Sequence, residues 1–177
     1  LADAVGSDAW DIGLIGAEPA RAEKIAFTAA YVEIEATYLV PAGSPLKTIA
    51  DVDRPGVRIA VSARSAYDLW LERNIKHATL VRSDATTSAT EKFMRDKLDA
   101  LAGLRPGLLT DIQKMPGARI LDGQFSAVQQ AVGTARTNAA AAKFLHDFVE
   151  EAKSSGLVAR LIEKHKVVGR LSVAPPG

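Results

Sequence analysis

The middle of the sequence alternates between short apolar, β-branched stretches and longer stretches with helical periodicity. The apolar stretches predict strands at residues 57–61, 78–81, 98–102 and 118–121. The stretches between them predict helices at residues 65–76, 87–97 and 105–113. Such a succession builds βαβ units, in which helices cover both faces of a parallel sheet. The central part of the chain is therefore predicted to be an α/β domain.

Further elements are predicted on both sides of this region. Residues 2–8 resemble the end of a helix, and strands are expected at 10–16, 34–40 and 127–133. An amphipathic helix is predicted at 138–153, with Asn138 as its N-cap, and a last helix at 157–165. The chain starts at Leu1 without an initiator methionine or a leader, so we expect it to be processed or trimmed.

Composition excludes several classes of function. The 22 Lys and Arg and 21 Asp and Glu residues give a net charge of +1 and form no basic stripe, so nucleic acid is not expected as a partner. Cysteine is absent, which excludes disulfides, thiolate metal sites and cysteine nucleophiles. The three histidines, at positions 77, 146 and 165, lack the spacing of metal ligands. No phosphate-binding loop, dinucleotide fingerprint or nucleophile elbow is present, so neither a cofactor nor a catalytic function is expected.

Three places in the sequence contain residues that could bind an anion. Arg21 follows a predicted strand that ends at Gly16, where a guanidinium could pair with a carboxylate, although it could equally pair with neighbouring Glu18 or Glu23. The second place is the loop from Ser62 through Arg64 to Ser65, which enters a predicted helix. Helix N-termini attract anions, and N-capping by Ser65 is an equally good explanation of this loop.

The third place is the turn at Leu104 and Arg105, after another predicted strand. Ligands of open α/β sheets bind beyond the carboxyl ends of the strands. Because the loops after two parallel strands share one sheet edge, Arg64 and Arg105 could converge on the same negative group. A convergent pair of this kind predicts an anion site more strongly than either arginine alone.

The order of these motifs resembles family 3 extracellular solute-binding proteins. In that family a strand leads into Thr-Pro-Glu-Arg, then Asp-Phe-Ser/Thr and Pro-Tyr, and residues 10–31 follow the same order. Residues 44–52 are similar to the family's entry to its second lobe, and Asp99-Ala100, Pro106 and residues 155–162 also match. The resemblance covers nearly the whole chain.

The resemblance implies a periplasmic-binding-protein-like fold of type II, in which two α/β lobes with mixed or parallel sheets close on a solute. It implies a periplasmic or extracellular receptor that delivers a small molecule to the permease of an ABC importer. The family's carboxylate-binding arginine corresponds to Arg21, and its second-lobe loop, whose hydroxyl and backbone N–H groups reach the ligand, corresponds to residues 62–65.

Departures from the family pattern bear on the ligand. Amino-acid binders of the family place an aspartate after the last second-lobe strand to hold the ligand's ammonium, whereas this sequence has Ala102-Gly103-Leu104-Arg105. An ammonium without a carboxylate partner is costly to bury. We therefore expect an anionic solute, with an organic acid favoured over an α-amino acid.

The family's opening strand-helix-strand-helix stretch has no counterpart here, so lobe one is expected to be incomplete. We expect partial lobe one at residues 1–35 and 125–177, lobe two at 36–124, and a hinge near 31–35 and 125–129. Exposed sheet surface in lobe one predicts a homodimer or a domain swap. Two alternatives stay open, a dehydratase-like enzyme of the same fold, with Glu18 or Glu33 as its acid, and the ligand-sensing domain of a regulator.

Overall fold

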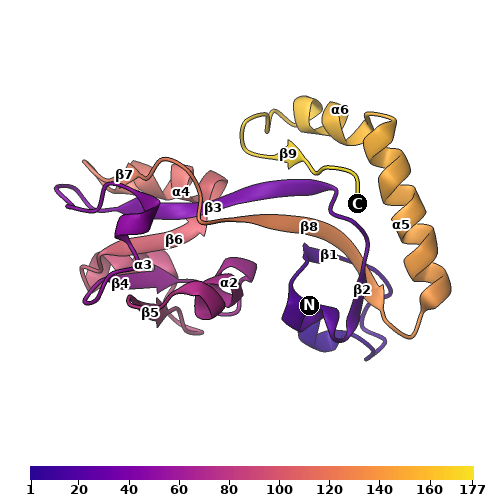
Figure 1. Ribbon diagram of the computed structural model, residues 1–177, viewed down its shortest axis with the longest axis horizontal. Coiled ribbons are helices and arrows are strands. Elements are labelled where there is room, and N and C mark those ends of the chain that lie inside the picture. The colour runs from indigo at the N-terminus through magenta and orange to yellow at the C-terminus, as the bar shows by residue number, and fades with distance from the viewer. The chain divides into compact units, whose positions relative to one another are not determined.

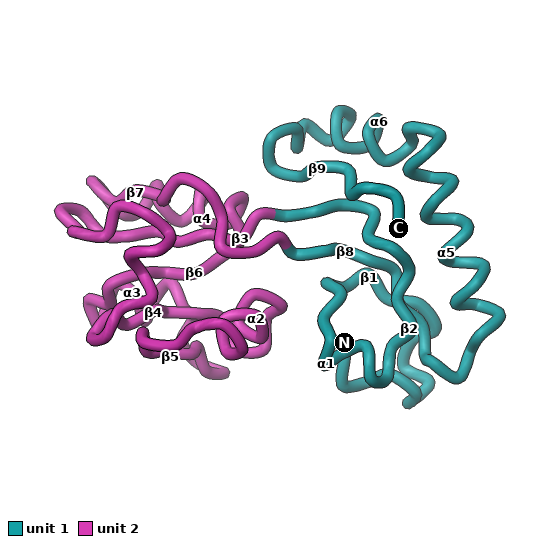
Figure 2. The backbone as a smooth tube through the Cα atoms, viewed as in Figure 1, with its two compact units in different colours: residues 1–34, 128–177 teal, residues 35–127 magenta.

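A computed structural model describes all residues from 1 to 177, and the chain divides into two compact units. One unit is formed by Leu1–Ile34 together with Val128–Gly177, and the other by Glu35–Ala127 (Figure 2). Two long strands, β3 (Val32–Val40) and β8 (Ser126–Ala135), contain the points at which the chain passes from one unit to the other. The sequence-based division placed these changes at 35/36 and 124/125, and in the structure they fall at 34/35 and 127/128.

The unit at residues 35–127 is built on a mixed sheet with the strand order β3-β6-β4-β5 (Figure 1). Its other strands are β4 (Arg58–Val61), β5 (Thr79–Arg82), β6 (Ala100–Leu104) and the short β7 (Arg119–Ile120). Strand β4 is parallel to β5 and β6, whereas β3 is antiparallel to β6 and to β7. The helices are α2 (Ala66–Asn74), α3 (Ala89–Arg95) and α4 (Arg105–Asp111), with 3₁₀ turns η2 (Ile49–Asp51) and η3 (Ile112–Lys114).

Strand alternation gives this sheet two apolar faces. Ile59 and Val61 of β4 pack in one cluster with Leu71 of α2, whereas Ala60 lies in the other with Phe93 of α3. The same alternation in β3 and β6 sends neighbouring residues to opposite sides of the sheet. Helix α2 therefore covers one face while α3 and α4 cover the other, which is the arrangement predicted from the sequence.

The unit formed by the two ends of the chain is organised around β8. Strand β1 (Gly13–Gly16) pairs with one edge of β8 and β2 (Ile25–Phe27) with the other, both antiparallel, and Gly133 is a partner in both pairs. Helices α5 (Ala139–Ser154) and α6 (Leu157–Lys164) pack on this region through two small apolar clusters. The remaining elements are η1 (Ala2–Ala4), α1 (Pro19–Ala22) and β9 (Ser172–Val173), which pairs with the start of β3.

Most of the differences between the predicted and the observed elements lie in the unit formed by the two ends of the chain. The expected helix at 2–8 is a single 3₁₀ turn, and the expected strand at 10–16 is limited to its last four residues. In the unit at residues 35–127, the strand predicted at 118–121 has only two residues. Helix α1 and strands β2 and β9 were not predicted, because elements of two to four residues are too short to establish a period.

Candidate functional site

In the unit formed by the chain ends, Arg21 is held directly behind the end of strand β1. Strand β1 ends at the buried Gly16, and α1 follows with Glu18 as its N-cap and Pro19 at its first position, where proline favours helix initiation. The Arg21 Nη1 atom donates a hydrogen bond to the Gly16 carbonyl oxygen at 2.9 Å, and the side chain is half-buried. A guanidinium has five N–H donors in a planar fork, so it can hold this carbonyl and still pair with a carboxylate.

A carboxylate is built into the same short segment. Glu18 lies three residues before Arg21, at the N-cap position of α1, and is only 7% exposed; its side chain makes no capping hydrogen bond. Further along, the Glu33 carboxylate in β3 accepts a 2.6 Å hydrogen bond from the Gln129 side-chain amide. The unit formed by the chain ends therefore contains a positioned guanidinium and a buried acid within one short segment.

In the unit at residues 35–127, the loop at residues 62–65 joins the end of β4 to helix α2. Arg64 is exposed and has a left-handed backbone with φ +62°, while the Ser65 hydroxyl caps α2 by accepting from the Asp68 amide at 3.1 Å. The Ala63 amide donates to the Ser83 hydroxyl at 3.0 Å. The capping role that the sequence allowed for Ser65 is thus present in the structure.

Asp68 is the central charged residue of this loop, and the sequence analysis did not identify it. Its side chain is 3% exposed, accepts from the Arg64 amide at 2.8 Å, and forms an ion pair with the Arg82 Nε atom at 2.9 Å. The hydrogen bond that Arg82 donates to the Asp68 carboxylate, together with the charges of Asp68 and Glu72, raises the pKa of Arg82. A serine followed three residues later by an aspartate is a capping signature, so the pattern at 65–68 was available in the sequence.

The turn at Leu104 and Arg105 has a different environment from the one expected. Since Leu104 pairs with Ala36 in the antiparallel β3–β6 ladder, Arg105 lies opposite Glu35. The Arg105 Nε atom pairs with the Glu35 carboxylate at 2.5 Å, and its Nη2 atom donates to the Gly123 carbonyl at 2.7 Å. A carboxylate of the same unit therefore neutralises the positive charge that Arg105 was expected to offer to a ligand.

The structure thus brings two of the three predicted places to one edge of one sheet. Strands β4 and β6 are parallel neighbours, so their carboxyl ends place residues 62–65 and 104–105 at the same edge. Gly16 and Arg21 belong to the other compact unit. No group of three or more His, Cys, Asp or Glu side chains is arranged to hold a metal ion.

Comparison with known proteins identifies the fold. No protein-family model matches the sequence, and no curated protein matches it. A structure of a binding component of an ABC transporter from Wolinella succinogenes, complexed with lysine, matches with a TM-score of 0.76 at 18% identity, covering 93% of this chain and 73% of the other.

Two further structures show the same fold. The solute receptor for L-cysteine of Neisseria gonorrhoeae has a TM-score of 0.75 and 19% identity, over 92% of this chain and 67% of its own. An ancestral amino-acid-binding protein, a precursor of cyclohexadienyl dehydratase, has a TM-score of 0.72 and 17% identity, over 92% and 72%. The chain has a mixed α/β, periplasmic-binding-protein-like fold, which it shares with these binding proteins, and this confirms the fold inferred from the motifs.

Proposed function

We propose that this protein is a solute receptor that binds a small anionic solute and presents it to the permease of an ABC importer. The observation that carries the proposal is the position of Arg21, which the Gly16 carbonyl fixes behind a strand end in a fold shared with solute-binding proteins. The role follows from the chemistry of the guanidinium, which recognises a carboxylate with two parallel hydrogen bonds.

The second group of candidate ligand-binding residues lies at the start of α2. The first amides of any helix lack carbonyl partners, and they favour negative charge. Ser62, Arg64 and Ser65 lie at this helix start, whereas Leu104 and Arg105 border the same sheet edge with the arginine already paired to Glu35. We therefore assign anion recognition in this unit to the 62–65 loop and give Arg105 the structural task of joining β6 to β3.

The test of the proposal is a ligand screen followed by one substitution. We expect dicarboxylic and other organic acids to raise the thermal midpoint, and Arg21→Ala to weaken their binding by about 2–5 kcal/mol, since it removes one partner of a desolvated charge pair. Arg95→Ala is the matched control, because Arg95 is exposed and pairs with the adjacent Asp96. Equal affinities in the two variants would remove Arg21 from the site.

A zwitterionic amino acid is a second candidate ligand, and buried Glu18 favours it. The sequence argument against an amino acid was the lack of a carboxylate for its ammonium, yet Glu18 is a buried carboxylate three residues from Arg21. Two of the three neighbours described above were solved with or named for amino acids, lysine and L-cysteine. Glu18→Gln separates the candidates, because losing this charge should weaken binding of an amino acid and leave or improve binding of an organic acid.

An enzymatic function is a further candidate, because one structural neighbour is a precursor of a dehydratase. The acid that such a reaction requires would be Glu18 or Glu33, of which only Glu18 is buried. Release of water from a cyclic carboxylate by the wild type, abolished in Glu18→Gln, would establish this activity. If the compound binds and is recovered unchanged, the enzymatic function is contradicted and the receptor function is the one supported.

A receptor of this kind would act in the periplasm or outside the cell. No helix of the structure combines the length and apolar character needed to cross a bilayer. A ligand-sensing domain of a regulator would use the same fold, and the flanking sequence in the gene distinguishes the two, since a sensor requires a DNA-binding or membrane-spanning segment. Co-purification of the chain with an importer permease would support the receptor.

We propose in addition that the chain associates with a second copy through strand β1. This strand is an edge of its sheet and pairs only with β8. Leu14 in the strand is 67% exposed, and Ile12, which directly precedes the strand, is 57% exposed. An unpaired edge with apolar side chains favours pairing with another strand. Light scattering should give a dimer for the wild type and a monomer for Leu14→Lys, and a monomeric wild type would contradict this assembly.

A further inference from the structure

A cavity of about 410 Å³ lies at the end of the 35–127 unit away from the candidate site. It is formed by the end of α3, the segment that follows η3, and the residues that follow β3, all at the left of Figure 1. Lys97 and Leu98 of its wall precede β6, whereas Arg105 follows that strand, so the cavity and the candidate site lie at opposite ends of β6. Its volume is within the range of small-molecule sites.

The cavity has an apolar wall and a cationic rim. Phe93, Leu98 and Met115 in the wall are buried members of one apolar cluster. The charged residues that line the cavity are Lys97 and Lys114, both exposed, and no acidic side chain lines it. An apolar surface bordered by two ammonium groups complements a molecule with an apolar tail and a negative head.

The carboxylates closest in sequence to this rim, Asp96, Asp99 and Asp111, have other partners: Asp99 accepts from the amide and side chain of Arg58, and Asp111 accepts from the Thr90 hydroxyl. Asp96, adjacent to Lys97, accepts two hydrogen bonds from Arg95, at 2.7 and 3.0 Å. Glu91 caps α3, and its pKa is lowered chiefly by the Ser88 amide and hydroxyl, with smaller contributions from Arg95 and Lys114. Neither lysine of the rim forms an ion pair closer than 4 Å, although the charge of Lys114 makes a small contribution to lowering the pKa of Glu91.

Both methionines of the protein, Met94 and Met115, line this cavity. Methionine has a flexible and polarisable side chain that adapts to ligands of differing shape. Met94 is 43% exposed although its side chain is large and apolar, whereas Met115 is buried. The only two such side chains in the sequence thus line one cavity, one of them exposed and one buried.

We propose that this cavity is a second ligand site, which takes an amphipathic carboxylate of medium chain length. The apolar tail would contact Met94, Met115 and Leu98, and the carboxylate would lie between Lys97 and Lys114. The site does not depend on the proposed receptor function, because it uses neither Arg21 nor the 62–65 loop.

The two methionines also allow ligand binding to this cavity to be measured by NMR. In the full chain labelled with ¹³C at the methionine methyl groups, the spectrum contains two resonances, and titration with octanoate should shift both in a saturable manner. Octylammonium, with the same tail and the opposite charge, should shift neither. Hexanoate should bind about tenfold or more weakly than octanoate, because each buried methylene contributes about a fourfold gain in affinity.

Two pairs of substitutions test the charge assignment. Lys97→Gln with Lys114→Gln should weaken octanoate binding at least tenfold, while Lys47→Gln with Lys76→Gln, an equal change of charge at exposed lysines outside the cavity, should change it less than twofold. Arg21→Ala should leave octanoate binding intact, which separates this site from the proposed receptor site. Methionine resonances that do not move with octanoate, or that move equally with octylammonium, would overturn the proposal.

Discussion

At the scale of single residues, Arg64 has a backbone conformation that usually favours glycine. Its φ of +62° costs a non-glycine residue about 1–2 kcal/mol, which exceeds the conformational entropy of about 0.5–1 kcal/mol that glycine loses on folding. We therefore expect Arg64→Gly to raise the thermal midpoint by a few degrees and to weaken binding of the anionic solute. Calorimetry and ligand titration on the same samples measure the two effects.

Lys166→Gly is the matched control for this prediction. Lys166 has nearly the same conformation, with φ +56°, and follows α6 in the other unit. It should give the gain in stability without any change in solute affinity. A lower midpoint for Arg64→Gly would show that the side chain stabilises the loop by more than its backbone conformation costs.

A second effect at the residue scale concerns stability in acid. The Asp53 carboxylate accepts hydrogen bonds from the amides of Lys76, His77 and Ala78, between 2.8 and 3.2 Å. Burial raises the pKa of Asp53, but the three amides lower it by more, so the pKa in the folded state is below its ordinary value. The contribution of this carboxylate to stability is thus fully present above about pH 4, the unfolded pKa, and is lost as the pH falls through the folded pKa.

Asp53→Asn should therefore destabilise the protein by about 1–2 kcal/mol at pH 7, because charged acceptors form the stronger hydrogen bonds. The difference in unfolding free energy between wild type and variant should shrink as the pH falls below 4. Urea titrations at several pH values measure this difference. If the difference in unfolding free energy were the same at all pH values, the charge of Asp53 would have no role in holding the segment after η2 against the residues that precede β5.

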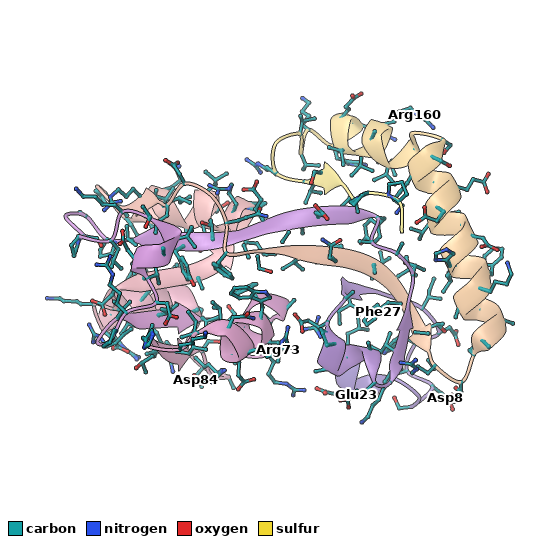
Figure 3. The ribbon with its side chains drawn as sticks, viewed as in Figure 1. Asp8, Glu23, Phe27, Arg73, Asp84 and Arg160 are labelled. Carbon is teal, nitrogen blue, oxygen red and sulfur yellow. The ribbon has the colours of Figure 1, made fainter.

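At the scale of elements, Gly133 is where three strands meet. It pairs with Gly13 of β1 on one side and with Phe27 of β2, labelled in Figure 3, on the other. A Cβ atom at this position would lie 2.5 Å from the Ile25 side chain and 3.3 Å from the Phe27 ring, and Ile25 is only 1% exposed. We expect Gly133→Ala to cost about 1–3 kcal/mol in thermal or urea denaturation, through overpacking.

Gly107 provides the control, because it lies in α4 and a Cβ there would meet no atom within 4 Å. Gly107→Ala should stabilise the protein by about 0.5–1 kcal/mol, as expected for replacing a glycine in a helix. If Gly133→Ala were as stable as Gly107→Ala, Ile25 would have to move without cost, and the close approach of β2 to β8 would not be needed for the fold.

The elements that could be predicted from sequence are those with a local period. Helices α2 to α6 and strands β4 to β6 each repeat a pattern over several residues, so the fold class was correctly predicted. The antiparallel β3–β6 pair could not be derived in this way, because it joins residues far apart in the sequence. For the same reason the Arg105–Glu35 ion pair was missed, whereas Asp68 lies within a local signature and could have been found.

At the scale of the whole molecule, the two units differ in how the chain builds them. Every residue of the two larger apolar clusters belongs to the unit at 35–127, and every residue of the two smaller ones to the other unit. The first unit is one continuous segment, while the second needs both ends of the chain. No apolar cluster is shared, so the stability of the continuous segment should depend on its own core.

We therefore expect residues 35–127, produced alone, to fold cooperatively with dispersed amide resonances and a single thermal transition. Leu71 is fully buried in the larger of the two apolar clusters of this fragment. Leu71→Ala should therefore lower the unfolding free energy of the fragment by about 2–5 kcal/mol. The same substitution in the full chain should have an equal effect, since every member of the Leu71 cluster belongs to residues 35–127. If the amide resonances of the fragment were poorly dispersed, the parts of β3 and β8 that lie outside residues 35–127 would be needed to stabilise this sheet.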